Sequence, residues 1–363
     1  MDTRIVAFGA TGYTGRLVVA SLVARGHRPV LAGRDGVRLE ALAAEHGRLD
    51  TAVADVARPE SVRALLRPGD VLVSTVGPFT RYGHVAVEAA IGAGAHYVDS
   101  TGEAPFIRDV FERYGPRAAE AGSALLTAFG YDYVPGNLAG ALAVRAAGPA
   151  ASRVDIGYFL RGLTKMSSGT RASGLAAVLL PHHAYRGGRP EMEPAMRRVA
   201  RFDCDGRALL AGSVGATEQY TLPRYAPQLD EVGVYLGWLG RGVRTAQAAS
   251  YVSPVLGRLL GGAAGKLPTV TGEGADAEER ARGGSRVLAV ARDAGGRPLV
   301  SVRIEGVDPY TLTGELMAWA ALRLAAGEMT GRGALGPVDA FGLDVLGEAC
   351  RHAGLTHVEI STS

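Results

Sequence analysis

The chain has 363 residues, 47% of them hydrophobic, which is enough for one large core or two packed domains and excludes intrinsic disorder. Its 39 Lys and Arg residues against 36 Asp and Glu residues leave a net charge of +3 without long like-charge runs, so no nucleic acid or membrane partner is expected. The two cysteines are far apart in the sequence, which indicates neither a disulfide framework nor a metal site. The N-terminus lacks the basic start and apolar core of a signal peptide, and a cytoplasmic protein is therefore favoured.

Short apolar runs alternate with helical patterns over the first 130 residues. Strands are predicted at Ile5–Phe8, Val30–Ala32, Thr51–Ala54, Val71–Thr75, His96–Val98 and Ala124–Leu126. Apolar residues at helical spacing lie between these runs. Six strands separated by helices predict βαβ units and a doubly wound, mostly parallel sheet of the Rossmann type. The fold class is therefore α/β.

Longer extended segments follow from about residue 135. They lie at Val154–Leu160, Arg197–Phe202, Val232–Leu236, Ser285–Arg292 and Leu299–Ile304, with a hairpin loop over residues 293–298. Helices are expected at Thr170–Tyr185, Val243–Leu260, Leu312–Ala326 and Val338–Ala353. This pattern predicts a second α+β domain with a mixed or antiparallel sheet.

The domain boundaries follow from this change of pattern. We expect a dinucleotide-binding domain over residues 1–134, a substrate and dimerisation domain over 135–308, and C-terminal helices over 309–363 that pack back on the first domain. Because a sheet-bearing second domain often pairs two subunits, a homodimer is one expected assembly.

A glycine-rich turn directly follows the first strand and opens the first helix. It reads Gly9-Ala10-Thr11-Gly12-Tyr13-Thr14-Gly15. Gly9 would permit the tight turn, Gly12 would let a pyrophosphate approach the backbone, and Gly15 would let the helix pack closely on the sheet. The turn therefore predicts a dinucleotide whose phosphates face the helix N-terminus.

The end of the second strand selects between the two nicotinamide cofactors. An acid there would bind the ribose hydroxyls of NAD, but Gly33 takes that place and Arg34 follows it. The Arg34 guanidinium suits the 2′-phosphate of NADP, so NADP(H) is favoured, with Asp35 as the residue that argues against it. Asp55 and Val56 would meet the adenine, or Asp55 would cap the helix that begins near Pro59.

Three further motifs lie at strand ends, at Ser74–Phe79, Gly94–Glu103 and Gly130–Gly136. Together with the glycine turn they resemble the saccharopine dehydrogenase-like reductases, and within them the trans-acting enoyl reductases. The resemblance continues through Lys165–Ser173 and Asp308–Tyr310 and so covers most of the chain, weakly between about residues 190 and 285. It implies an NADP-dependent oxidoreductase with a mixed-sheet second domain that helps to form the substrate cleft.

The loops after strands one, four, five and six should converge on the nicotinamide, because ligands bind outside the carboxyl ends of such strands. Thr75, Val76, Gly77, Pro78 and Gly102 are therefore assigned to the cofactor. The candidate substrate residues are Phe79, Thr101, Lys165 and Ser168. Lys165 is alternatively a solvated loop lysine.

The chain departs from the family after the sixth strand, where Tyr131 and Tyr133 replace the usual Phe and Ser on either side of Asp132. A phenol can donate the proton that completes a hydride transfer, so Tyr133 and Tyr131 are the catalytic candidates. The alternative is that both rings only wall the cleft. His182 and His183 are interpreted as structural residues at a helix end.

Three functions compete. The first is NADPH-dependent reduction of a conjugated C=C bond in an apolar, polyketide- or lipid-derived small molecule, favoured by aromatic residues such as Phe79, Tyr158, Phe159 and Trp238. The second is reduction of an imine or 2-oxo acid to a secondary amine. The third is a regulator that binds NADP without catalysis.

Overall fold

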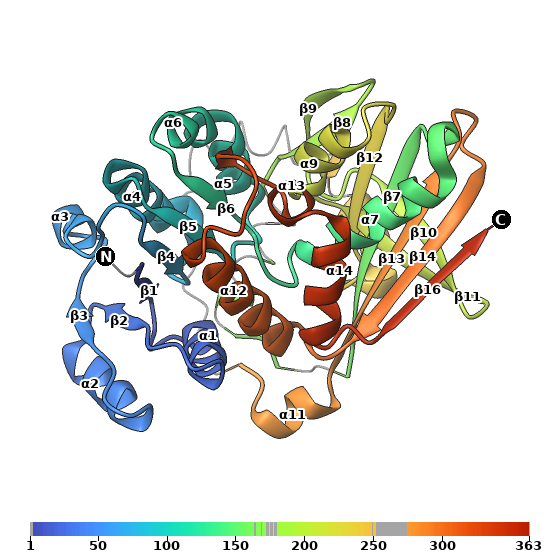
Figure 1. The fold of residues 1–363 in the computed structure, drawn as a ribbon. Helices are drawn as coiled ribbons and strands as arrows, with labels where there is room; N and C mark the ends of the chain where they lie inside the picture. Colours follow the sequence, from blue (N-terminus) through green and yellow to red (C-terminus); the bar gives the residue numbers. More distant parts are fainter. Residues whose placement is uncertain are drawn as a thin grey trace. The chain divides into compact units, whose positions relative to one another are not determined.

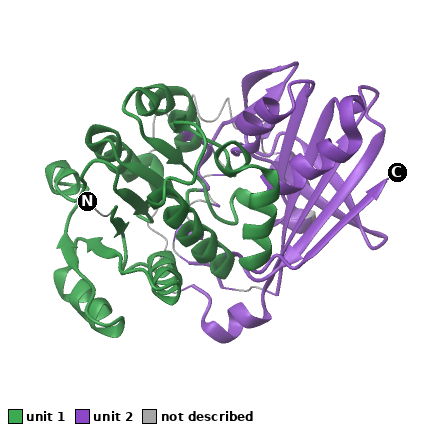
Figure 2. Ribbon diagram, in the orientation of Figure 1, with its two compact units in different colours: residues 1–101, 106–134, 310–353 green, residues 102–105, 135–309, 354–363 purple. Residues whose placement is uncertain are grey.

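The computed structural model describes residues 3–162, 165–167, 169–171, 174, 177, 180–248, 250–251 and 274–362. The chain divides into two compact units, coloured green and purple in Figure 2. Unit 1 comprises residues 1–101, 106–134 and 310–353, and unit 2 comprises residues 102–105, 135–309 and 354–363. Residues 310–353 thus belong to unit 1, whereas the last ten residues belong to unit 2.

Unit 1 contains a parallel sheet with the strand order β15-β6-β5-β4-β1-β2-β3 (Figure 1). The strands are β1 Ile5–Phe8, β2 Val30–Gly33, β3 Thr51–Val53, β4 Val71–Ser74, β5 His96–Asp99, β6 Ala124–Leu126 and β15 Gly333–Ala334. Every residue of β1, β4 and β5 is buried, and β1 and the first three residues of β4 are accordingly continuous apolar runs in the sequence. The six predicted strands are confirmed, and the two-residue β15 was not predicted.

The helices of unit 1 lie between its strands and in the C-terminal segment that belongs to this unit. They are α1 Tyr13–Ala24, α2 Gly36–Glu45, α3 Pro59–Arg63, α4 Phe79–Ala93, α5 Ala104–Asp109, the π-helix η1 Val110–Tyr114, α6 Gly115–Glu120, α12 Pro309–Ala325, α13 Pro337–Phe341 and α14 Leu343–His352. The single helix predicted over Val338–Ala353 is wrong. Gly342, at φ +78°, separates α13 from α14 in a conformation that side chains other than glycine rarely adopt.

Unit 2 contains a nine-stranded sheet with the main order β10-β11-β12-β7-β13-β14-β16. The strands are β7 Arg153–Arg161, β8 His182–Arg186, β9 Arg189–Glu193, β10 Val199–Cys204, β11 Arg207–Ser213, β12 Glu231–Leu236, β13 Gly284–Arg292, β14 Pro298–Gly306 and β16 His357–Thr362. Strands β7 and β12 run parallel and the other pairs are antiparallel, so the predicted mixed sheet is confirmed.

Helices α7 Val134–Ala147 and α9 Glu218–Tyr225 contact strands of this sheet. Unit 2 also contains α11 Ala277–Arg282 and short 3-10 turns at Gly148–Ala150 and Gly240–Gly242. Two predicted helices need correction. In the one expected over Thr170–Tyr185, the described residues 170, 171, 174 and 177 are helical, but strand β8 begins at His182, so His182 and His183 lie on a strand. Of the one expected over Val243–Leu260, residues 243–248 and 250–251 are helical, and residues 252–260 lie outside the described residues.

The sheet of unit 2 curls. Strand β10 contacts β7, although two strands lie between them in the sheet order. Neighbouring strands are about 4.8 Å apart, so this contact requires strong curvature. The concave side holds a core cluster of Phe159, Phe202, Cys204, Ala211, Tyr235 and Leu288. No helix in the described part of the chain is long and apolar enough to cross a membrane.

Candidate cofactor and active site

The glycine turn after β1 is a tight loop that folds onto the first turn of α1. Gly9 has φ +86°, and its N–H donates to the carbonyl of Ala32 at 2.9 Å. A Cβ atom on Gly15 would lie 2.2 Å from the Gly9 carbonyl oxygen, so no side chain fits there. The sequence assigned Gly15 to packing between helix and sheet, whereas in the structure it makes room for the loop itself.

The N-terminus of α1 is open to an anionic ligand. Gly12 is the N-cap residue, and neither a capping side chain nor an acidic residue fills the first turn. The amide groups there and the positive end of the helix dipole suit a phosphate group. Ala10 is fully buried and can offer only its backbone, while Thr11, Tyr13 and Thr14 are partly exposed. Tyr13 contacts the ring of Tyr310 edge-on, with centroids 4.9 Å apart.

The loop after β4 packs directly against the glycine turn. The Thr75 hydroxyl donates to the Gly9 carbonyl at 3.2 Å, and a Cβ atom on Gly9 would lie 2.9 Å from Val76 Cγ2. Strands β1 and β4 are neighbours at the point where the strand order reverses, which is where doubly wound sheets bind their ligands. Gly77 and Pro78 continue this loop and are exposed.

Arginine side chains surround the end of β2. Arg34 is exposed and makes no hydrogen bond or ion pair with any described residue. Asp35, which argued against NADP, instead caps α2 by accepting the Arg38 N–H at 3.1 Å. The Arg38 guanidinium donates to the carbonyl of Thr11 at 3.2 Å, beside the glycine turn. Sequence analysis did not propose Arg38 as a cofactor residue, although its position in the first turn of α2 could have indicated it.

The loop after β3 excludes one of the two interpretations of Asp55. The Asp55 carboxylate accepts the Ala57 N–H at 2.9 Å and so closes a local turn. The N-cap residue of α3 is Arg58, and capping of that helix by Asp55 is therefore wrong. Asp55 and Val56 are both half-buried, and contact of either with adenine stays a prediction.

A buried carboxylate holds the loops after β5 and β6. Asp99 accepts the N–H of Thr101 at 2.8 Å, the N–H of Ala128 at 2.9 Å and the hydroxyl of Thr127 at 2.8 Å. Burial raises the pKa of Asp99 to about 6 in spite of these donors. Thr101 is fully buried within this network, so any contact with substrate would need it to be uncovered.

The segment after β6 buries its polar side chains. Tyr131 and Tyr133 are 3% and 1% exposed. Burial, with the neighbouring Asp132 as a second cause, raises the pKa of Tyr131 well above its ordinary value. A raised pKa makes the phenol a weaker acid, and the role of Tyr131 as proton donor stays a prediction.

Asp132 is the group that sequence analysis missed. Its Oδ1 atom is buried and has no hydrogen-bond partner among the residues that the structure describes, and desolvation raises the pKa of this carboxyl to about 7. A carboxyl that titrates near neutral pH can release a proton under the conditions in which the protein works. The signal in the sequence was an acid between two aromatic residues in the segment that follows the buried strand β6.

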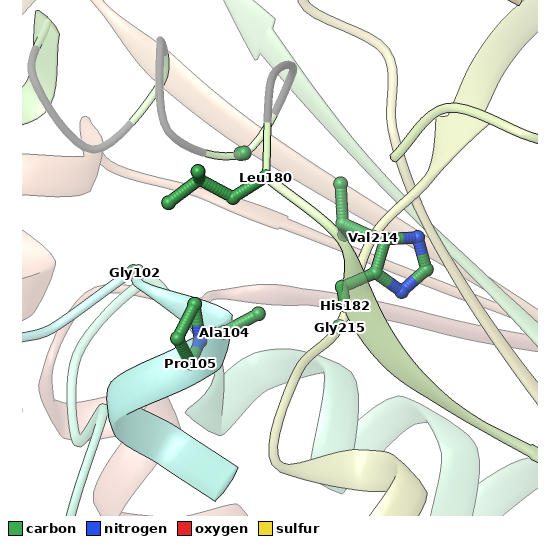
Figure 3. A pocket seen from close by; sticks show the side chains of 8 residues that line it. Gly102, Ala104, Pro105, Leu180, His182, Val214 and Gly215 are labelled. Carbon is green, nitrogen blue, oxygen red and sulfur yellow. The ribbon is translucent and has the colours of Figure 1, made fainter. Parts of the chain in front are cut away.

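Gly102, assigned to the cofactor, lines a narrow crevice within unit 2. The crevice lies between the start of α5 and strand β8, and Figure 3 shows Ala104, Pro105, Leu180 and His182 around it. Its volume of about 10 Å³ is close to that of one water molecule. His182 donates from Nδ1 to the carbonyl of His183 at 2.8 Å, and burial lowers the pKa of His182 to about 4, so it is a neutral structural residue.

The other candidate substrate residues are Lys165, Ser168 and Phe79. Lys165 is exposed and its ammonium pairs with Asp276 at 3.3 Å and Glu279 at 3.4 Å, which favours the alternative of a solvated loop lysine. Ser168 lies outside the described residues. Phe79 is 5% exposed and packs on Phe106, with ring centroids 5.6 Å apart.

Two aromatic residues of the expected apolar cleft belong to the core of unit 2. Phe159 packs against Phe202 with centroids 5.7 Å apart. The hydroxyl of Tyr158 donates to the buried Glu218 at 2.6 Å and accepts the Gly136 N–H at 2.9 Å. The argument for an apolar substrate from these two side chains is therefore wrong.

Comparison with known proteins identifies the cofactor. Residues 5–126 match the saccharopine dehydrogenase NADP binding domain, so the predicted resemblance and NADP(H) as cofactor are confirmed. A trans-acting enoyl reductase of Mycobacterium ulcerans is 38% identical over 143 residues, which cover 38% of this chain and 34% of the relative. One of Mycobacterium bovis is 36% identical over 140 residues, which cover 37% and 34%. The alignments thus span about a third of these relatives.

A solved structure has the same fold. Apo saccharopine dehydrogenase (L-Glu forming) of Saccharomyces cerevisiae matches over the whole of both chains with a TM-score of 0.60 and 15% sequence identity. This confirms the predicted fold class, a Rossmann-type parallel sheet with a second, mixed-sheet domain.

Proposed function

We propose that this chain is an NADPH-dependent oxidoreductase that delivers a hydride to a conjugated C=C bond of an apolar, polyketide- or lipid-derived small molecule. The main support for an NADPH-dependent oxidoreductase is the open glycine turn beside Arg34, which lies within the residues that match an NADP-binding domain. The C=C bond is suggested by relatives that are named trans-acting enoyl reductases.

The residues around the turn fit NADPH. The N-terminal end of α1, which begins after the N-cap residue Gly12, would hold the pyrophosphate, and Arg34 would hold the 2′-phosphate because Asp35 is committed to capping α2. Thr75 and Val76 keep the loop after β4 against the turn, so that Gly77 and Pro78 would border the nicotinamide. NADPH supplies the hydride when it is bound.

The proton is the second requirement of the reaction. Asp132 can donate it from its unpaired Oδ1 when the carboxyl is protonated, and a pKa of about 7 leaves much of it protonated near neutral pH. Tyr131 and Tyr133 are buried on either side of Asp132 in the sequence. They remain the alternative donors, or they limit the access of water to the carboxyl.

A second candidate reaction is the reduction of an imine to a secondary amine. It is favoured by the fold, because the structural neighbour with a TM-score of 0.60 is a saccharopine dehydrogenase. A substrate of that kind carries several carboxylates and would need cationic partners near the nicotinamide. A regulator that binds NADP without catalysis is the third candidate. The cytoplasmic location and a homodimer stay predictions.

Single-turnover oxidation of bound NADPH separates these candidates. The protein is mixed with an α,β-unsaturated thioester, with a preformed imine or with neither, and the absorbance of NADPH is followed. We expect oxidation with the unsaturated thioester. Oxidation with the imine alone would replace the proposed reaction by the second one, and tight NADPH binding without oxidation in any arm of a substrate panel would favour the regulator.

A further inference from the structure

Strand β16 forms one edge of the sheet in unit 2 (Figure 1). It pairs with β14 over six residues in a regular antiparallel register and, among the described residues, with no other strand. All six of its residues are exposed. The backbone groups on its outer side are therefore free to pair with a further strand.

The apolar side chains of β16 continue a buried row of the sheet. Val358 lies opposite Ile304, and Ile360 lies opposite Val302, so the four side chains share one face. Ile304 and Val302 are 0% and 1% exposed, whereas Val358 and Ile360 are 43% and 49% exposed. The apolar face thus runs to the edge of the sheet and is open there.

This edge lacks the features that usually keep edge strands apart, which are proline, lysine and β-bulges. Strand β16 contains none of them, and its one acidic residue, Glu359, is paired with Arg303 of β14 at 2.6 Å. Strand β9 differs, because it begins with Arg189-Pro190-Glu191. At the other end of the main strand order, β10 curls back onto β7. Among the described strands of this sheet, β16 is thus the unprotected edge.

The sequence of β16 is complementary to itself. When two copies run antiparallel about Val358, His357 of each copy lies opposite Glu359 of the partner subunit, where an imidazole N–H can donate to the carboxylate. A register centred on Glu359 would instead place two carboxylates opposite each other, which is unfavourable. A register centred on Ile360 would place Glu359 opposite Ser361 of the partner subunit and form no charged pair. Charge complementarity therefore favours the register about Val358.

We infer that β16 is an interaction surface for a second copy of this chain. The two strands pair antiparallel about a twofold axis at Val358 and join two nine-stranded sheets into one. Val358 and Ile360 of both copies then share one apolar face at the junction. Because two short strands bury less area than a standard protein interface, the dimer should dissociate on dilution in the micromolar range. This inference specifies a surface for the expected homodimer and does not depend on the proposed reaction.

Sedimentation velocity over a range of micromolar protein concentrations tests the inference. We expect a monomer–dimer equilibrium in the wild type. Val358→Lys places two ammonium groups opposite each other at the axis, so it should remain monomeric, and its melting temperature should be unaltered because Val358 is exposed. Met192→Lys is the matched control, since Met192 is an exposed apolar residue of β9, and it should dimerise like the wild type. A wild type that is monomeric at every concentration, or a dimer that persists in Val358→Lys, would overturn the inference.

A cysteine at position 358 tests the register and does not depend on the effect of the lysine. In the proposed pairing the two residues at this position lie directly opposite each other, with Cβ atoms about 4.5–5.5 Å apart, which is close enough for a disulfide to form with a small adjustment. Val358→Cys should therefore give a disulfide-linked dimer under mild oxidation, and the native Cys204 and Cys350 are buried and should not react. Ile360→Cys is the control, because position 360 would lie opposite Thr356 of the partner subunit. Cross-linking of Ile360→Cys without cross-linking of Val358→Cys would overturn the proposed pairing.

Discussion

The carboxylate of Asp99 accepts a hydrogen bond from the backbone N–H of Ala128 at 2.9 Å. Asp99 ends β5, and Ala128 follows β6 in the left-handed conformation, at φ +54°. This bond ties together two loops that lie at the same edge of the parallel sheet. One of these loops leads to Thr101, and the other leads to Tyr131, Asp132 and Tyr133. The order of the candidate active site thus depends on one buried acid.

Asp99→Ala should destabilise the protein strongly. The change leaves the N–H groups of Thr101 and Ala128 buried without an acceptor, which costs about 2–4 kcal/mol of unfolding free energy. Urea denaturation of Asp99→Ala, with the exposed Asp50→Ala as control, measures this loss. A difference below about 0.5 kcal/mol between the two variants would show that the loops do not need the carboxylate.

The raised pKa of Asp99 also predicts a pH dependence of stability. A folded pKa of about 6 lies above the unfolded value near 3.8, so the folded state favours the neutral acid. Its contribution to stability is complete below pH 3.8 and is lost as the pH rises through 6. Asp99→Asn should therefore flatten the unfolding free energy between pH 4 and 7 relative to the wild type. An unchanged slope would contradict the assignment.

Arg34→Ala should weaken NADPH selectively. Loss of a charge-assisted contact with the 2′-phosphate costs about 1.5–3 kcal/mol, whereas NADH has no such phosphate and should bind nearly as before. Fluorescence titration with both cofactors measures the two losses, and the exposed Arg63→Ala on α3 serves as the control. Equal weakening of NADPH and NADH would remove Arg34 from the 2′-phosphate site.

Gly12→Val should abolish cofactor binding while the fold survives. A branched side chain at the N-cap of α1 occupies the space that the pyrophosphate needs, and its Cβ would already lie 3.2 Å from the Gly9 carbonyl oxygen. Gly92→Ala is the matched control, because a Cβ there meets nothing within 4 Å and lies within helix α4. NADPH binding at wild-type strength in Gly12→Val would show that the glycine turn holds no phosphate.

The pH dependence of turnover tests Asp132 as proton donor. Only the protonated carboxyl can donate, so kcat/KM should fall as the pH rises through about 7. Asp132→Asn should remove this inflection and lower turnover by about 10² to 10⁴, with little change in NADPH affinity. Tyr131→Phe and Tyr133→Phe keep the rings and test the phenols in the same assay. An inflection that persists in Asp132→Asn but disappears in one Phe variant would transfer the role to that tyrosine.

Local pattern determined which parts of the fold could be predicted. Strands β1 and β4 are buried on both faces, and their unbroken apolar runs are visible in the sequence. Strand β16 is exposed along its whole length and contains only the two exposed apolar residues Val358 and Ile360, and β9 is exposed along most of its length, so neither has a buried apolar face. Strand β8 follows an apolar stretch with helical spacing, and its pairing with β12 depends on residues more than 40 positions away.

The same distinction between features set by neighbouring residues and features set by distant residues applies to the candidate site. The glycine turn was predictable, because its geometry is set by seven consecutive residues. The ion pairs of Lys165 with Asp276 and Glu279 span more than 100 positions and have no local signature. The unpaired state of Asp132 is a property of its surroundings, and neighbouring residues in the chain do not reveal it.

Transfer of deuterium from NADPH that is labelled at the reactive C4 position tests the central claim most directly. The product formed from an α,β-unsaturated thioester is analysed by mass spectrometry and NMR. The account predicts a saturated thioester with one deuterium on the β carbon and a solvent proton on the α carbon. Recovery of the unsaturated thioester without deuterium, together with a deuterated amine from the imine arm, would contradict it.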